Sequence, residues 1–293
     1  MLPRPRLLVT NDDGVDAIGL HVLAEAMTEL GDVVVVAPHT EFSGSGAALG
    51  ALHLMRPEVR QVVIDGVDES WAVNGPPGLC VMLARLGCFG KIDLVVSGIN
   101  PGANVGRAIY HSGTVGAALT ARNGGVSGVA VSQAVAGFGV EGQGWDEMIA
   151  DQQWSSAAAV ASSVVGALLA DLPEEPVVVN VNVPNLPLGR MRGWREATIA
   201  RLPPRTVSTG RLDPVAGRKG VFTVHMEWGS QWVLPSETDS GAIERDEVTI
   251  SFLSRIVADD RPDLHAVGTA VADRLATARQ PEGSREDSYT PGA

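Results

Sequence analysis

The sequence predicts an α/β protein with a doubly wound, mainly parallel sheet and a smaller C-terminal β-rich extension. The continuous apolar run VVVV at 33–36 is typical of a strand buried on both faces, and further apolar runs such as PVVVNVNVP at 176–184 also predict strands. Segments with helical spacing of apolar residues separate these runs. Hydrophobic residues make up 45% of the 293-residue chain and aromatic residues only 4%, so small aliphatic side chains must fill the core.

Strands and helices are expected to alternate over the first 185 residues. Apolar runs bounded by polar residues or glycine predict strands at 6–10, 33–36, 61–65, 70–75, 92–96, 128–132 and 176–184. The two short segments QVVID and SWAVNG are expected to form a hairpin around Gly66. Helical periodicity, with glycine or proline at several boundaries, predicts helices at 18–30, 77–86, 114–122 and 145–170. This alternation favours a sheet with helices on both faces.

The composition changes after residue 185. Residues 186–255 contain Pro, Trp and alternating segments such as VFTVHMEW, which predict antiparallel strands in a lobe or oligomerisation arm. A helix is expected at 263–279, and the last residues are expected to be disordered because they lack apolar content. The predicted organisation is a main α/β domain over 1–185, an extension over 186–280 and a tail over 281–293.

Charge and cysteine content narrow the class of protein. A formal net charge of −12 argues against binding to a nucleic-acid polymer or an anionic membrane. No apolar stretch reaches the roughly 18 residues of a spanning helix, and the N-terminal apolar run is too short for a signal peptide. Cys80 and Cys88 lie about 12 Å apart if both are on one helix, so we expect two buried thiols that do not pair. These features favour a cytoplasmic protein.

Polar residues follow three of the expected strands. Strand 6–10 is followed by Asn11, Asp12, Asp13 and Gly14, strand 33–36 by a loop with Ser43, and strand 92–96 by Asn100 and Asn104. Ligands of open α/β sheets bind beyond the carboxyl ends of the strands, so these side chains are expected to converge. Their oxygen donors suit Mg²⁺, Mn²⁺ or Ca²⁺ better than zinc. An Asx turn that caps the next helix is the alternative explanation of Asn-Asp-Asp-Gly.

The segment HSGTVGAAL at 111–119 is expected to begin a helix. Backbone N–H groups and the positive end of the helix dipole would make a phosphate site of Ser112, Gly113 and Thr114. An ordinary Ser or Thr helix cap explains the same residues. His111 is expected to be a loop residue rather than a catalytic base. Dinucleotide binding at the glycine-rich segment 44–50 is not expected, because its last glycine comes one residue late.

Together, these motifs resemble the survival protein E family, the SurE-type metal-dependent nucleotidases. The resemblance rests on TNDDGVDAIGL, VVVVAP followed by Ser43-Gly44, DLVVSGINPGANVG, HSGTVGAAL and VNVNVP, in this order over residues 6–185. It implies a Rossmann-like domain whose smaller C-terminal extension is exchanged between subunits in a homodimer or homotetramer. It also implies hydrolysis of 5′- and 3′-nucleoside monophosphates to nucleoside and phosphate.

The resemblance also implies roles for individual residues. One divalent ion, Mg²⁺ or Mn²⁺ with Ca²⁺ as a substitute in crystals, would be held by Asp12, Asp13, Ser43 and Asn100. The phosphate would lie near Asn11, Gly44, Asn104, Ser112, Gly113 and Thr114. Asp12 or Asp13 would orient or deprotonate the attacking water. More loosely, Asp239 and DEVTISFL match the family's late acidic turn and strand, and the exchanged arm would lie at 200–235.

Two positions depart from the pattern of that family. Glu41-Phe42 precede Ser43 where members usually carry a basic residue, and Gly75-Pro76-Pro77 replaces the common Gly-Thr-Pro. The first change removes positive charge beside the expected phosphate, and the second removes a hydroxyl group. Two alternatives therefore stay open: a broad acid phosphatase or exopolyphosphatase with the same site, and a nucleotide-binding sensor with weak turnover.

Overall fold

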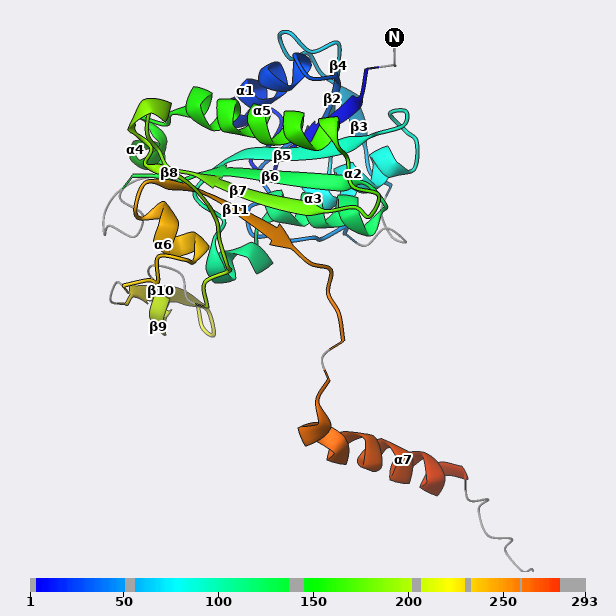
Figure 1. Cartoon of the computed structure of the whole chain (residues 1–293). Helices are drawn as coiled ribbons and strands as arrows, with labels where there is room; N and C mark the ends of the chain where they lie inside the picture. The colour runs from blue at the N-terminus through cyan, green and yellow to red at the C-terminus, as the bar shows by residue number, and fades with distance from the viewer. Residues whose placement is uncertain are drawn as a thin grey trace, which may run out of the picture. The chain divides into compact units, whose positions relative to one another are not determined.

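The computed structural model describes residues 4–50, 56–136, 145–201, 207–229, 233–258 and 260–279. The chain divides into two compact units, Met1–Arg255 and Ile256–Ala293, each of which is described by itself. The first unit contains a nine-stranded sheet with helices on both faces (Figure 1). Its strand order is β3-β4-β2-β1-β5-β6-β7-β11-β8. The predicted α/β class with a mainly parallel sheet is confirmed.

Parallel strands form the centre of this sheet. They are β4 (Glu69–Val73), β2 (Asp32–Pro38), β1 (Arg6–Thr10), β5 (Leu94–Pro101), β6 (Ser127–Gln133) and β7 (Val178–Val183). Nearly all of their residues are buried, as the continuous apolar runs predicted. At one edge, β3 (Val59–Gln61) pairs antiparallel with β4, and a bridge joins Ile64 to Val67 across Gly66. The predicted hairpin around Gly66 is therefore confirmed, but its first strand is Val59–Gln61 rather than the expected 61–65.

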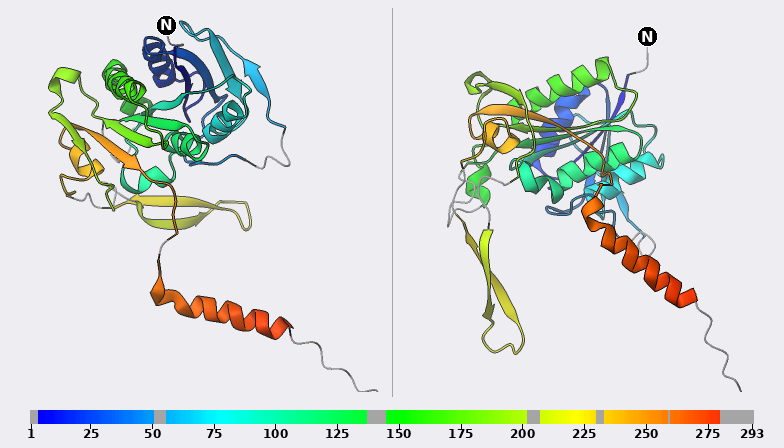
Figure 2. Two further views of the ribbon diagram at one scale, coloured as in Figure 1. Left: turned by 45° about the vertical axis from the view of Figure 1, so that its right-hand side comes forward. Right: turned by 60° about the horizontal axis from the view of Figure 1, so that its bottom comes forward.

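Helices cover both faces of the sheet (Figure 2). On one face, α1 (Ile18–Thr28) and α5 (Trp154–Ala170) pack over a core of aliphatic side chains. On the other face lie α2 (Pro77–Arg85) and α3 (Gly113–Asn123), which follows the short 3₁₀ helix η1 (Gly106–Tyr110). Because the helices cover the two faces of the sheet, the carboxyl ends of the central strands stay accessible to a ligand.

The long helix expected at 145–170 is interrupted. Its first part is α4 (Trp145–Ile149), and α5 begins only at Trp154. Between them the Gln153 N–H donates to Asn185 Oδ1 at 2.8 Å, and the Gln153 carbonyl accepts from Gln133 Nε2 at 2.9 Å. The prediction of one continuous helix is wrong because side chains from the strand ends bind this backbone.

Strands from the C-terminal segment complete the sheet. The strand β11 (Glu247–Leu253) pairs antiparallel with β7, and β8 (Gly193–Glu196) pairs parallel with β11. The hairpin of β9 (Val207–Pro214) and β10 (Phe222–Trp228) forms a separate two-stranded sheet, and α6 (Asp239–Ile243) precedes β11. The sheet thus uses strands from both sides of residue 185, and the division into domains at that residue stays a prediction.

The second unit contains the 3₁₀ helix η3 (Pro262–Leu264) and the helix α7 (His265–Arg279), close to the expected 263–279. Residues 281–293, expected to be disordered, lie outside the described residues. In the parts of the chain that the structure describes, no helix combines the length and the apolarity needed to cross a membrane.

The two cysteines have different surroundings. Cys80 is buried in α2, whereas Cys88 is exposed and lies beyond the end of that helix. The prediction of two buried thiols on one helix is therefore wrong for Cys88. Helix α2 ends at Arg85, and Gly87 follows with a positive φ of 88° that continues the chain out of the helix.

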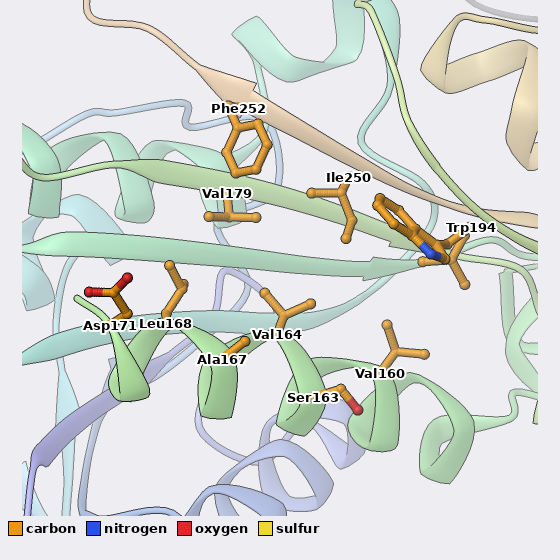
Figure 3. A pocket seen from close by; sticks show the side chains of 11 residues that line it. Val160, Ser163, Val164, Ala167, Leu168, Asp171, Val179, Trp194, Ile250 and Phe252 are labelled. Carbon is orange, nitrogen blue, oxygen red and sulfur yellow. The ribbon is translucent and has the colours of Figure 1, made fainter. Parts of the chain in front are cut away.

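A groove of about 600 Å³ lies between α5 and the strands β7, β11 and β8 (Figure 3). Its lining is mostly apolar, with Ser163 and Asp171 as the polar exceptions. The groove contains neither of the paired aspartates from the loop after β1. It is therefore separate from the polar site expected at the strand ends.

Candidate active site

The loop after β1 places two adjacent carboxylates at the centre of the sheet. Strand β1 lies between β2 and β5, at the point where the order of strands reverses, which is the usual ligand position in this architecture. Asn11 is wholly buried, and its Nδ2 donates to the Gly14 carbonyl at 2.9 Å, closing the turn. The capping position of α1 is Ala17, which makes no side-chain cap. Helix capping therefore does not account for Asp12 and Asp13.

Asp12 faces the N-terminus of α3. Only 3% of Asp12 is exposed, and the hydroxyl of Thr114 donates to its Oδ1. Burial raises the pKa of Asp12, while hydrogen bonds from Thr114 and from the backbone of Gly113 oppose that rise. A Cβ at Gly113 would lie 2.6 Å from the Asp12 Cβ, so α3 approaches this carboxylate too closely for any side chain to fit between them.

Asp13 has an unsatisfied carboxylate oxygen. Its buried Oδ2 has no hydrogen-bond partner. Burial first, and then the charges of Asp12 and Glu41, raise the pKa of Asp13 to about 8. No ion pair joins Asp12 or Asp13 to a basic side chain within the described ranges. Buried carboxylates need a compensating charge, and a divalent cation would supply it for both, so these residues fit a metal.

The other expected ligands come from the two neighbouring strands. Asn100 lies within β5, which continues past the expected end at 96 with a register shift between Ser97 and Asn100. Its Nδ2 donates to the Gly102 carbonyl at 2.7 Å, so Oδ1 would be the ligand atom in the predicted metal site. Ser43 is exposed in the loop after β2, next to Phe42, whose N–H donates to the Asp12 carbonyl at 2.7 Å. This bond ties the two loops together.

The donor set must include neutral oxygens. Among the described residues, no group of three or more His, Cys, Asp or Glu side chains could hold a metal ion. An ion at Asp12 and Asp13 would therefore complete its coordination with neutral oxygens, and Asn100 and Ser43 could provide an amide and a hydroxyl oxygen. The assignment of Ser43 and Asn100 as ligands stays a prediction.

Three of the expected phosphate residues have structural partners. Asn104 is buried, and its Nδ2 donates to Ser132 Oγ at 2.8 Å. The hydroxyl oxygen of Ser112 accepts the N–H of Val115 at 3.1 Å, so Ser112 caps α3. This is the ordinary helix cap that was the alternative explanation of the motif. Thr114 donates to Asp12, as described above. Their contacts build the frame of the site, and their roles toward phosphate stay predictions.

The remaining expected residues lie close to the same loops. Gly44 is exposed in the loop after β2, with a positive φ of 80° that suits glycine. Two residues later, the Gly46 N–H donates to the His111 carbonyl at 3.0 Å. His111 is an exposed residue just before α3, as expected for a loop position. This contact joins the loop after β2 to the start of α3.

The sequence analysis missed Ser45 and matched Asp239 to the family only loosely. Ser45 has a buried Oγ without a partner, 2.9 Å from the point where a Gly113 Cβ would lie, and Asp12 Oδ2 is 2.8 Å from that same point. Ser45 is therefore a near neighbour of Asp12. Asp239 is wholly buried and accepts the Gly106 N–H, although 133 residues separate them. No local sequence pattern indicates such a contact.

Comparison with known proteins decides the family. The family model described as Survival protein SurE matches residues 7–206. The chain belongs to the SurE family. The resemblance seen in the motifs is thus confirmed, and the SurE match covers the loops that carry Asp12, Asp13, Ser43 and Asn100.

Individual SurE proteins agree with this assignment. A protein named 5′-nucleotidase SurE from Legionella pneumophila is 39% identical over 190 residues, which are 64% of this chain and 67% of that protein. One of the same name from Acinetobacter baumannii is 37% identical over 209 residues, 71% of this chain and 76% of that protein. The crystal structure of the SurE protein from Aquifex aeolicus has a TM-score of 0.70 at 27% identity, over 92% of this chain and 100% of that one.

Proposed function

We propose that this chain is a divalent-metal-dependent phosphomonoesterase that hydrolyses nucleoside monophosphates, at the 5′ or the 3′ position, to nucleoside and phosphate. The observation that carries the proposal is the pair of carboxylates at the start of α3: Asp12 is buried, Asp13 is half-buried with a buried Oδ2, and neither has a basic partner in the described part of the chain. The names of the SurE relatives, which are 5′-nucleotidases, support the substrate class.

Asp12, Asp13, Ser43 and Asn100 would hold one Mg²⁺ or Mn²⁺ ion. When bound, such an ion neutralises charge that develops on the phosphoryl oxygens and lowers the pKa of a bound water. Burial, and after it the charges of Asp12 and Glu41, raise the pKa of Asp13 in the protein alone, and the positive charge of the ion would oppose this rise. Asp13 would then be ionised at neutral pH.

The two carboxylates have different tasks in this proposal. Asp12 Oδ1 is occupied by the hydroxyl of Thr114, which fixes the orientation of that carboxylate. Asp13 Oδ2 has no donor, so it is the oxygen that can accept a proton from the attacking water or orient it. The positive end of the α3 dipole, directly beside Asp12, would favour a phosphate at the same place.

We further propose that the protein is a homodimer or homotetramer in which the β9–β10 hairpin contacts another subunit. One face of the hairpin exposes Leu212, Phe222, Val224 and Met226, and Val224 pairs with Leu212 across the strands. A two-stranded sheet alone is marginally stable in water, so a second copy of the chain is expected to cover this face. Light scattering of wild type and Val224→Glu tests this, and an unchanged molar mass would exclude the hairpin as the contact.

The experiment for the activity is phosphate release from AMP, GMP, 3′-AMP and polyphosphate with Mg²⁺, Mn²⁺ or EDTA. Wild type is compared with Asp12→Ala. Metal-dependent release from the monophosphates that is lost in the variant supports the proposal, and a preference for polyphosphate supports the broader phosphatase. A nucleotide sensor with weak turnover is the second candidate, because Glu41-Phe42 stand where SurE proteins usually carry a basic residue before the ligand serine. Bound nucleotide that survives incubation with Mn²⁺ would support that candidate.

A further inference from the structure

Asp239 is a buried carboxylate to which the proposed chemistry gives no role. It is the first residue of α6 and is 0% exposed. Its Oδ2 accepts the N–H of Gly106 at 2.8 Å. Its Oδ1 accepts the N–H groups of Ala200 at 2.9 Å and of Ser240 at 2.7 Å. Besides the N–H of its own neighbour Ser240, the carboxylate thus binds two backbone segments that are distant in sequence, at Gly106 and at Ala200.

Gly106 needs this acceptor. It is the first residue of η1, where a backbone N–H has no partner inside the helix. Gly106 is also buried, so water does not satisfy its N–H, and an unpaired buried donor is costly. Its φ of 54° lies in the left-handed region, which only glycine adopts at low cost, so the chain can enter η1 here while the N–H binds Asp239. Asp239 therefore fixes the point at which η1 begins.

The helix η1 connects Gly106 to the start of α3. Within it, the Ser112 N–H donates to the Ala108 carbonyl at 3.0 Å, and Ser112 then caps α3. Immediately after that cap, Gly113 lies against Asp12. A displacement of Gly106 would therefore move the start of α3 relative to the carboxylates.

The chain before η1 is held just as firmly. The N–H of Asn104 donates to Asn182 Oδ1 at 2.7 Å, and its carbonyl accepts from Asn180 Nδ2 at 2.9 Å. Asn104 is therefore anchored to β7, whereas Gly106 is anchored to Asp239. With the first anchor intact, loss of the second would let η1 move while the sheet keeps its structure.

We propose that Asp239 is a positioning residue for the phosphate side of the active site. It fixes the start of η1 and, through η1, the position of Ser112 and Gly113 beside Asp12. Asp239 itself does not contact substrate in this proposal. The inference rests on the proposed function, since a phosphate is the group expected at the start of α3.

Asp239→Asn tests the role, because the carboxamide keeps the size of the side chain but has only one acceptor oxygen. If that oxygen faces Ala200 and Ser240, two donors stay satisfied and the amide NH₂ opposes the N–H of Gly106. The matched control is Thr238→Ala. It removes the cap of α6, in which the Thr238 hydroxyl accepts the Gly241 N–H at 3.1 Å, without touching η1.

Two readouts are compared among wild type, Asp239→Asn and Thr238→Ala. Hydrogen–deuterium exchange of peptides covering 104–112 reports the opening of η1, and steady-state kinetics with AMP at saturating Mn²⁺ separate KM from kcat. Asp239→Asn is expected to speed exchange of this segment at least about tenfold and to raise KM about tenfold, with kcat within about threefold. Thr238→Ala is expected to change each value less than about twofold.

Unchanged exchange at 104–112 in Asp239→Asn, or equal effects of the two substitutions, would overturn the proposal. If Asp239→Asn does not fold, Asp239→Ser, which keeps a small acceptor at the start of α6, provides the same comparison. If wild type releases no phosphate from AMP, the proposed function fails instead. Calorimetric binding of inorganic phosphate with Mn²⁺ then replaces KM, and equal affinity in wild type and Asp239→Asn would overturn the positioning role.

Discussion

Replacing Gly113 by alanine tests how closely α3 must approach Asp12. The new Cβ would lie 2.6 Å from Asp12 Cβ and 2.8 Å from Asp12 Oδ2, and Ser45 Oγ would be 2.9 Å away. Carbon atoms in ordinary contact are about 3.5–4.0 Å apart, so Asp12 and the start of α3 must separate by about 1 Å. The bond from Thr114 to Asp12 would be strained or lost in the process.

A displacement of about 1 Å at a catalytic group can lower the rate about 100-fold. We therefore expect Gly113→Ala to reduce kcat/KM for AMP with Mn²⁺ about 100-fold, which is about 3 kcal/mol of transition-state stabilisation. Alanine is a better helix former than glycine, so helix propensity does not oppose folding of the variant.

The control for this substitution is Gly166→Ala in the middle of α5. Its Cβ would lie 3.7 Å from Leu30 Cδ2, which is ordinary contact, and kcat/KM is expected to stay within about twofold. Circular dichroism and thermal unfolding establish that both variants fold. A folded Gly113→Ala protein with the turnover of wild type would refute the reasoning that α3 and Asp12 form the site.

Three further predictions concern the carboxylates. Asp13→Asn is expected to lower phosphate release from AMP at saturating Mn²⁺ at least about 100-fold, because one negative ligand is lost; near-normal release would contradict the metal assignment. The proton on Asp13, whose pKa is raised to about 8, competes with the ion below that pH. Mn²⁺ affinity, measured by electron paramagnetic resonance, should therefore rise about tenfold per pH unit up to about pH 8 and then level off, and a flat profile from pH 6 to 8 would be inconsistent with this. Glu41→Lys is expected to lower KM for AMP about two- to fivefold at low salt but not at high salt, and Glu41→Gln is the neutral comparison.

Local patterns predicted the centre of the sheet and the position of its carboxylates. The run at 33–36 indicates a strand buried on both faces, and β2 is such a strand. Asp12 and Asp13 follow β1 directly, so the end of one strand sufficed to place them at the carboxyl edge of the sheet. The residues SGINP in β5 were expected as a loop because glycine and proline are rare in strands.

Features that depend on distant parts of the chain could not be predicted in this way. The addition of β11 and β8 to the sheet depends on pairing between strands far apart in sequence, and periodicity gives no partner for a strand. Asp239 resembles any acidic residue at a helix start until its bond to Gly106 is seen. Ser45 was missed for a similar reason, since only the folded loop brings it near Asp12.

The most direct test of the central claim is the stoichiometry and affinity of Mn²⁺ binding at pH 8, measured by electron paramagnetic resonance. Wild type is compared with Asp12→Asn, Asp13→Asn and the control Gly166→Ala. The account predicts one ion per chain in wild type and in the control, and at least about 100-fold weaker binding in each aspartate variant. Equal binding of Mn²⁺ by wild type and both aspartate variants would contradict the claim that Asp12 and Asp13 form the metal centre of this SurE protein.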